Sequence, residues 1–208
     1  ILYNMDEGMA MKKKSLLFII TLFLLTGCHM MTPEQTLTTF LNGLKKQNAR
    51  MVYLSYGGKM SKKDIEEDID VADDYLHGVD TTNLKKEALK KFLDFDFTIN
   101  AVALHNNHAK IQVTITTYDS GKLLKDWLED YQARVVVTRF SGAKRFEIKE
   151  KAIEKLTNDI AHLTQKDYQS TIYFTLTKKS SWKVDELSDE VKNALTGGLL
   201  ETVERLND

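Results

Sequence analysis

The chain has 208 residues, a length that favours one domain or two small ones. Its residues are 42% hydrophobic and 28% charged, values typical of globular proteins, so a disordered, collagen-like or polytopic membrane protein is excluded. The 29 Lys and Arg residues nearly balance the 30 Asp and Glu residues, giving a net charge of -1. This balance argues against a dedicated nucleic-acid binder, because such binding depends on neutralising phosphates.

The first segment has the three parts of a secretory signal peptide. Three lysines, Lys12–Lys14, precede an apolar run from Leu16 to Leu25, and small residues follow. The run is too short to cross a membrane, since a spanning helix needs about 20 apolar residues. We therefore expect residues 1–27 to be a cleaved leader. Its start codon is open among three methionines: Met5, Met9 and Met11.

The leader ends on Leu25-Thr26-Gly27-Cys28, which resembles the lipobox of bacterial lipoproteins. The resemblance implies that the Cys28 thiol accepts diacylglycerol, that this residue becomes the new N-terminus, and that palmitate-type acyl chains anchor the protein to the cell membrane. Cys28 is the only cysteine in the chain, and it occupies the one position that the motif requires. The alternative is an ordinary signal peptide that happens to lie beside a cysteine.

Acylation of Cys28 uses the only thiol, so the mature chain has no disulfide, no cysteine nucleophile and no cysteine metal site. Each buried methylene of an acyl chain contributes about 0.8 kcal/mol, and two chains give stable attachment. Residues 28–31 are then a short lipid-anchored linker, and residues 32–208 form a single domain.

Thr32-Pro33-Glu34-Gln35 predicts the start of the first helix, with threonine as N-cap, proline at N1 and glutamine completing a capping box. The helical stripe that follows consists of Leu37, Phe40, Leu41 and Leu44. A second short helix is predicted after Asn48, ending before Gly57-Gly58, and a fourth begins near Thr82.

A third helix, predicted after Ser61, carries the densest acidic run of the chain, within residues 64–74. A calcium loop of the EF-hand type would need a glycine, and the run contains none. Ile65, Ile69 and Ala72 place the run on an amphipathic helix, so we interpret its carboxylates as a solvated face. An acidic surface that docks a partner is the alternative.

The hydrophobic period changes from 3.6 to 2 after residue 94, which indicates strands. The first strand is predicted to place five side chains on the core face: Phe95, Phe97, Ile99, Ala101 and Ala103. The returning strand covers residues 111–115, and residues 105–108 form the turn, because asparagine tolerates a left-handed backbone. A second hairpin is predicted over residues 168–177 and 181–185.

Between the hairpins the spacing predicts a long helical insert from Ser120 to about Thr164. Ser141-Gly142 is the expected bend or break. Val135–Val137 is open to a strand alternative, because β-branched residues weaken a helix.

A last helix is predicted from Ser188 to Leu206, with an apolar stripe that runs through Gly197-Gly198. Each glycine costs a helix about 1 kcal/mol relative to alanine. Close packing of the helix on the sheet is the simplest reason for the pair, and approach of a ligand is the second.

Two segments of the domain carry a family resemblance. They are Thr32–Gln35 with Phe40-Leu41 and Leu44-Lys45-Lys46, and Trp182-Lys183-Val184-Asp185 followed by Asn193–Leu200. The chain resembles small lipoproteins of Gram-positive bacteria with domains of the nuclear-transport-factor-2-like, cystatin-like superfamily. The resemblance implies an α+β fold. A curved antiparallel sheet of about four strands, in two hairpins, would form a cone with a long helical insert and packed N- and C-terminal helices. That superfamily contains both enzymes and binding modules, so the fold does not settle activity.

Enzymes of that superfamily place an acid or a histidine inside the cone as general base, which makes Asp96 the candidate here. If helices cover both sheet faces, Asp96 would line a pocket and have a raised pKa. The aromatic residues that could line the same pocket are Trp127, Tyr131 and Tyr173, with ordinary core packing as the alternative.

The histidines do not predict a metal site. His105 and His108 lie in a predicted turn, and the nearby Asp94 and Asp96 are too far along the strand to join them as ligands. His162 lies late in a predicted helix, where an imidazolium interacts favourably with the helix dipole. We expect no metal and no other cofactor.

No nucleophile, base and orienting group converge in the sequence. We therefore expect an extracytoplasmic binding or interaction module without catalysis of its own, anchored to the outer face of the cytoplasmic membrane by diacylglycerol on Cys28. Its expected partners are an envelope protein, a peptide or a small molecule, and not nucleic acid. The alternative is a small-molecule enzyme that uses a pocket carboxylate inside the cone. A third hypothesis is that the apolar leader segment, Thr21 to Gly27, acts after cleavage as a peptide that carries a signal to other cells.

Overall fold

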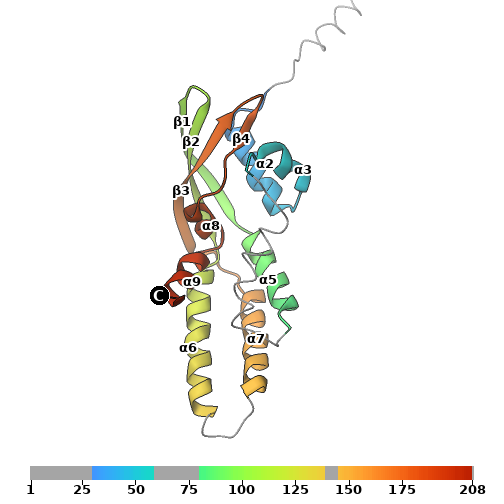
Figure 1. Cartoon of the computed structure of the whole chain (residues 1–208), viewed down its shortest axis with the longest axis vertical. Coiled ribbons are helices and arrows are strands. Elements are labelled where there is room, and N and C mark those ends of the chain that lie inside the picture. Colours follow the sequence, from blue (N-terminus) through green and yellow to red (C-terminus); the bar gives the residue numbers. More distant parts are fainter. Residues whose placement is uncertain (1–29, 59–79, 139–144, 208) are drawn as a thin grey trace, which may run out of the picture. The chain divides into compact units, whose positions relative to one another are not determined.

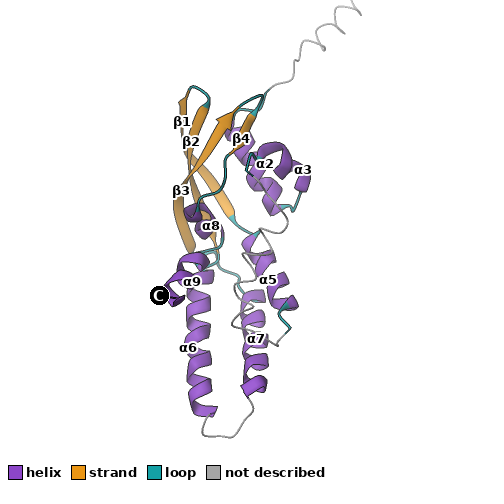
Figure 2. Ribbon diagram, in the orientation of Figure 1, coloured by secondary structure: helices purple, strands orange, loops and turns teal. Residues whose placement is uncertain are grey.

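A sheet of four antiparallel strands, in the order β1-β2-β3-β4, lies at the centre of the fold. The strands are β1 (Asp96–His105), β2 (His108–Thr117), β3 (Tyr168–Lys178) and β4 (Trp182–Val184). A computed structural model describes residues 30–58, 80–138 and 145–207 (Figures 1 and 2). The predicted α+β class is confirmed: the sheet consists of two hairpins, a helical insert separates them, and helices precede and follow them.

The chain divides into two units, Ile1–Met31 and Thr32–Asp208, and all the helices and strands in the described residues belong to the second. Three features predicted from the sequence lie outside the described residues. They are the lipobox with Cys28, the acidic run of residues 64–74 with its helix, and Ser141-Gly142.

The first hairpin has the predicted turn, with Asn106 in left-handed backbone at a φ of 53°. Its first strand differs from the prediction, because the register shifts between Ile99 and Ala101. One extra residue reverses the alternation of a strand. Val102 therefore packs against the core, and Ala101 and Ala103 are exposed, so the prediction that these two alanines face inward was wrong.

One face of the sheet carries the main core. The inward side chains of β2 and β3 alternate strictly and are at most 3% exposed, from Ala109 to Ile115 and from Ile172 to Leu176. Helices α2 (Pro33–Lys45) and α8 (Asp189–Leu195) cover this face through Leu37, Phe40 and Val191. Polar and exposed residues alternate with these on the outer face of the sheet.

Helix α2 begins with the predicted capping box. The backbone N–H of Gln35 donates to Thr32 Oγ1 at 3.2 Å, and the N–H of Thr32 donates to Gln35 Oε1 at 3.0 Å. Helix α3 (Ala49–Ser55) follows, capped by Asn48 as predicted. After α3 the chain turns onto the sheet, where Tyr56 forms a parallel bridge to Val184 and stacks on Phe40 at 5.3 Å between ring centroids.

The helical insert forms a second, smaller core. Helices α6 (Ser120–Thr138) and α7 (Arg145–Ala161) run side by side, and α5 (Thr82–Phe92) packs on α7 (Figure 1). The buried residues of this core are Leu84, Trp127, Ala152, Ile153 and Leu156. Residues 135–137 are helical, so the strand alternative for that stretch is excluded.

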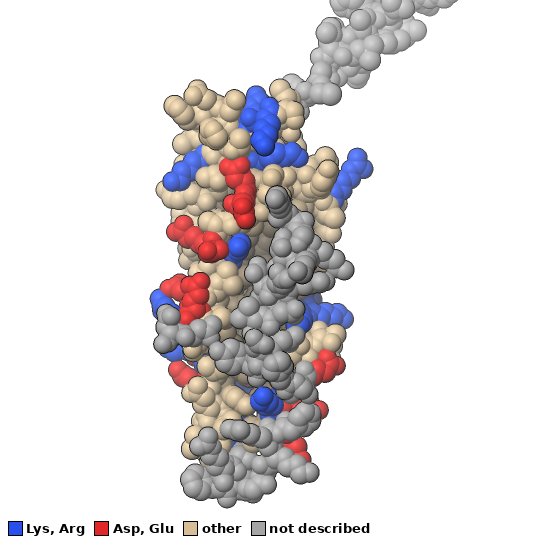
Figure 3. Space-filling model, viewed as in Figure 1, with Lys and Arg blue, Asp and Glu red and all other residues tan. Residues whose placement is uncertain are grey.

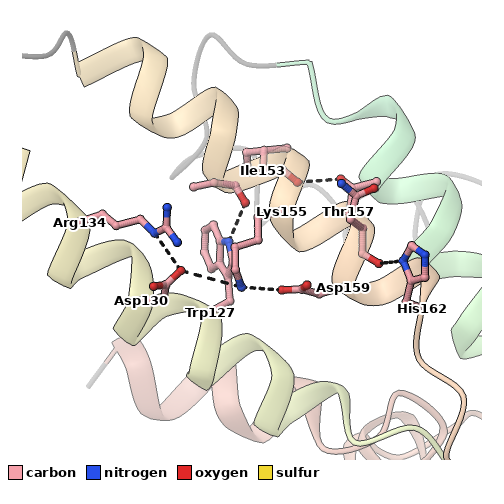
Figure 4. Close-up of polar contacts among 10 residues, drawn as sticks. Trp127, Asp130, Arg134, Ile153, Lys155, Thr157, Asp159 and His162 are labelled. Atoms are coloured by element: carbon pink, nitrogen blue, oxygen red, sulfur yellow. Dashed lines mark hydrogen bonds and ion pairs between the residues drawn. The ribbon is translucent and has the colours of Figure 1, made fainter.

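Polar contacts add to the packing of α6 on α7 (Figure 4). Trp127 Nε1 donates to the carbonyl of Ala152 at 2.8 Å, and Lys155 lies between Asp130 and Asp159, at 3.9 Å and 2.8 Å. The indole bond is buried, so it fixes the rotation of the two helices about their axes more firmly than the exposed ion pairs do.

The last helix is broken, contrary to the prediction of one continuous helix. Gly197 and Gly198 have φ angles of 64° and 77°, and they separate α8 from α9 (Leu199–Asn207). A Cβ on Gly197 would lie 1.9 Å from the carbonyl oxygen of Tyr118, and the N–H of Gly121 donates to the Gly197 carbonyl at 2.9 Å. The glycines thus allow a left-handed turn to approach the start of α6.

Candidate functional site

Asp96, the candidate general base, is the first residue of β1 and lies on the outer face of the sheet. Its side chain is 62% exposed. It forms two ion pairs, one with Lys45 at 3.1 Å and one with Lys166 at 3.0 Å. Lys45 is the last residue of α2, and Lys166 lies in the loop between α7 and β3.

Asp94 lies beside this pair and completes a charged cluster. Lys166 Nζ donates to Asp94 Oδ1 at 2.9 Å, and Tyr118 Oη donates to Asp94 Oδ2 at 2.7 Å. Five residues from five segments therefore meet, and we name them the junction cluster: Lys45, Asp94, Asp96, Tyr118 and Lys166.

Helix α5 reaches the junction cluster through Lys91. Its Nζ lies 4.8 Å from the centre of the Tyr118 ring and donates to the carbonyl of Leu163 at 2.6 Å. A cation over an aromatic face is attracted by the ring quadrupole. The cluster therefore links the sheet, through Asp96 and Tyr118, to the smaller helical core.

The hydrogen bonds of the junction cluster shift the pKa values of several of its residues. The bond from Tyr118, followed by that from Lys166, holds the pKa of Asp94 below its usual value. The bond from Lys166, opposed by slight burial, lowers the pKa of Asp96. Burial acts to lower the pKa of Lys166, but its bonds to Asp94 and Asp96 outweigh burial and raise that pKa. The bond to Asp94 raises the pKa of Tyr118.

These directions describe carboxylates that are ionised and a phenol that is protonated at neutral pH. A general base works best when its pKa lies near the operating pH, which requires a carboxylate pKa to rise. The pKa of Asp96 is lowered instead, and its side chain is largely exposed. The chemistry of the junction cluster is therefore that of a structural ion-pair network.

The aromatic candidates for a pocket do not meet Asp96. Trp127 and Tyr131 belong to α6, where their rings stack at 5.6 Å in the smaller core. Tyr173 lies on the outer face of β3, is 46% exposed, and accepts a 3.0 Å hydrogen bond from Gln112 Nε2. Asp96 pairs with Thr116 of β2, whereas Tyr173 pairs with Gln112 of β2. Asp96 and Tyr173 therefore lie on the same face of the sheet but at different positions along the strands.

Two histidines flank the predicted turn as the last residue of β1 and the first of β2, and His162 lies one residue past the end of α7 and not within the helix as predicted. His105 and His108 pair across the β1–β2 turn and are exposed, and His162 Nδ1 donates to the carbonyl of Asn158 at 2.7 Å. Within residues 30–58, 80–138 and 145–207, no three His, Cys, Asp or Glu side chains form a group that could hold a metal ion. None of the helices in those ranges is both long and apolar enough to cross a bilayer.

Sequence reasoning did not find the roles of Lys166 and Tyr118. Lys166 lies 70 residues from Asp96, and neither residue belongs to a periodic stripe or motif. The one signal was the pair Asp94 and Asp96 on either side of Phe95, since a nearby cation stabilises two neighbouring ionised carboxylates.

No protein-family model matches the chain, and no curated protein sequence matches it. Among solved structures, the chain is similar to the crystal structure of a candidate lipoprotein (ycdA) from Bacillus subtilis subsp. subtilis str. 168, with a TM-score of 0.48 and 15% sequence identity. The match covers 78% of this chain and 54% of that one, so this chain spans about half the length of that protein. A likeness this distant does not establish a shared activity or location.

Proposed function

We propose that the protein is a lipoprotein whose domain is held at the outer face of the cytoplasmic membrane by diacylglycerol on Cys28. The observation that carries this proposal is the tetrapeptide Leu25-Thr26-Gly27-Cys28, directly after a basic and then apolar leader, with Cys28 as the sole cysteine. Stable anchoring requires two acyl chains, which a diacylglycerol supplies. A domain of the nuclear-transport-factor-2-like superfamily fits the α+β arrangement and is part of the same proposal.

The domain binds or interacts and performs no catalysis of its own. Two observations support this part of the proposal. The inner sheet face is filled by packed side chains such as Phe40, Phe174 and Leu176, each at most 1% exposed. The carboxylate that the fold offered as a base, Asp96, is exposed and paired with two lysines.

The binding partner in this proposal is an envelope protein, a peptide or a small molecule. The outer face of the sheet supports it by carrying a row of exposed or half-buried hydrogen-bonding side chains: Thr98, Gln112, Thr114, Thr171 and Tyr173. Such groups retain donors and acceptors for a polar ligand.

Membrane fractionation of producing cells tests the anchoring. Wild-type protein is expected in the membrane fraction, and Cys28→Ala is expected in the medium or as an unprocessed precursor. Thr26→Ala keeps a small residue and the cysteine, and it serves as the control that stays with the membrane. Wild-type protein recovered as a processed soluble form would contradict the proposal.

A thermal-shift screen of envelope metabolites and peptides tests the absence of catalysis. A ligand that binds the native state raises the unfolding midpoint by mass action. The expected result is a stabilising compound that is recovered chemically unchanged after incubation. A stabilising compound that is recovered as product would show that the domain is an enzyme.

A further inference from the structure

The two hairpin turns lie at one end of the sheet and touch each other. The backbone N–H of Lys178, at the end of β3, donates to the carbonyl of Asn107 in the β1–β2 turn at 2.8 Å. The segments that build this end are residues 104–111 and 176–184, and we name them the turn face (Figure 1).

The turn face carries four lysines, and Asp185, which directly follows its second segment, accepts a 3.2 Å hydrogen bond from Thr177 Oγ1. Its two segments contain no Asp or Glu, and its four lysines are Lys110, Lys178, Lys179 and Lys183. Figure 3 shows several Lys and Arg side chains toward one end of the visible surface, with acidic side chains directly beside them. Leu104, 61% exposed, adds an apolar side chain to the turn face.

Some lysines of the domain are neutralised by carboxylates of the described residues, and those of the turn face are not. Away from this face, Lys45, Lys155 and Lys166 each pair with at least one carboxylate within 3.1 Å. None of the four turn-face lysines pairs with a carboxylate of the residues that the structure describes. Lys110 and Lys178 instead lie over aromatic rings, and Lys183 donates to the carbonyl of Leu54 at 2.7 Å. Their charge is left for an external anion.

The first residues of helix α2 lie toward the same end of the domain. Helix α2 ends at Lys45, which pairs with Asp96 at the end of the sheet opposite the turns. Its 13 residues span about 20 Å, and α2 packs on β4, so its first residues lie toward the turn face. Cys28 precedes Thr32 by four residues, a reach of about 14 Å when fully extended.

We infer that the turn face rests on a bilayer of anionic phospholipid, with Lys110, Lys178 and Lys179 near the headgroup phosphates. This inference rests on the proposed lipid anchor, because a tether of at most about 14 Å would keep the start of α2 near the bilayer. Attraction between lysines and an anionic surface falls off over a Debye length, about 8 Å at physiological salt. Each lysine near an anionic surface adds attraction. The outer sheet face then stands away from the membrane plane and is open to partners.

Hydrogen exchange of the lipidated protein in vesicles tests the orientation. The acylated protein is placed in vesicles of phosphatidylcholine alone and in vesicles of phosphatidylcholine with phosphatidylglycerol. Exchange of the amides of residues 105–108 and 178–181 is expected to slow several-fold in the anionic vesicles only, and to recover in high salt. Amides of the exposed part of α6 are expected to exchange equally in both.

Two charge-matched variants separate the turn face from net charge. The triple variant Lys110→Gln, Lys178→Gln and Lys179→Gln is expected to lose the protection by phosphatidylglycerol. The control, Lys86→Gln, Lys125→Gln and Lys151→Gln, removes three exposed lysines of the helices and is expected to keep it. Equal behaviour of the two variants would overturn the inference.

Three other results would also overturn it. They are unprotected turns in anionic vesicles, equal protection in neutral vesicles, and equal protection by soluble poly(glycerol phosphate) without lipid. The mass of the Cys28 peptide from the same sample tests the anchor separately. Acylated Cys28 with unprotected turns contradicts the orientation alone, whereas unmodified Cys28 with protected turns contradicts the anchor alone.

Discussion

Tyr118 donates a 2.7 Å hydrogen bond through its hydroxyl to Asp94, and its carbonyl oxygen is the atom that a Cβ on Gly197 would strike. The first relationship joins the end of β2 to the residues before β1. The second fixes how closely the turn between α8 and α9 approaches the start of α6. One residue, 6% exposed, therefore joins the two strands of the first hairpin at their open end and limits how closely the turn between α8 and α9 can approach.

Tyr118→Phe removes the hydroxyl and keeps the ring under Lys91. The free energy of unfolding is expected to fall by about 1 kcal/mol, the net contribution of a hydrogen bond in folding. Urea denaturation measures the change. Tyr173→Phe is the control, since Tyr173 is on the exposed outer face, and it is expected to change the value by less than about 0.5 kcal/mol. Equal effects of the two variants would show that the hydrogen bond from Tyr118 to Asp94 contributes no more to the free energy of unfolding than an exposed hydroxyl does.

The junction cluster predicts an acid-dependent loss of stability. Folding lowers the pKa of both Asp94 and Asp96, so their contribution is complete above the unfolded pKa, about 3.9, and is lost as pH falls through the lower folded pKa. Lys166→Gln removes the cation that both share, which brings the two pKa values back toward the unfolded one. We expect the variant to lose less stability than wild type between neutral pH and the acid range.

Urea denaturation at a series of pH values measures this slope. Lys192→Gln, which removes an exposed lysine paired with Asp189 on α8, is the control and is expected to leave the slope unchanged. A Lys166→Gln slope that equals the wild-type slope would mean that Lys166 does not hold these carboxylates in solution.

The two adjacent glycines are expected to differ in what they tolerate. Gly198→Ala places an L-residue in left-handed backbone and is expected to cost about 1 to 2 kcal/mol. Gly197→Ala adds a collision with backbone, so its cost is expected to exceed about 3 kcal/mol. Thermal or urea unfolding of both variants measures the difference. Equal costs would indicate that the turn can move away from Tyr118.

The helical insert depends on the indole N–H of Trp127. Trp127→Phe leaves a smaller ring and removes the buried bond to Ala152, and we expect a loss of about 2 kcal/mol. Tyr131→Phe, on the same helix and in the same ring stack, keeps the ring and is expected to cost less than about 0.5 kcal/mol. The unfolding free energy of each variant distinguishes the bond from the stacking.

Local signals were sufficient for the elements of this fold. The capping box at Thr32 and the alternation over residues 111–115 both act within a few residues, so the first helix and the hairpin were predictable. The break at Gly197 was not, because the sequence stripe continues through it and the reason for the break is the carbonyl of Tyr118, far away in the chain. The register shift at Asn100 in β1 was not predictable either. In the sequence, apolar residues occupy alternate positions both before and after Asn100, so nothing marks the extra residue.

The candidate site was less predictable than the fold. Asp96 was identified as a residue of interest, but its partners Lys45 and Lys166 lie 51 and 70 residues away, and no spacing rule connects them. The charge and burial of a residue depend on those distant neighbours. For that reason a carboxylate that alternation places off the core face was equally consistent with a pocket or with an exposed ion pair.

Metabolic labelling with a palmitate analogue tests the central claim most directly, since it detects the bond between an acyl group and this chain. Wild-type protein is expected to carry the label on the peptide that begins at Cys28, and Cys28→Ala is expected to carry none. Wild-type protein that fractionates with the membrane and takes up no label would contradict the lipid anchor.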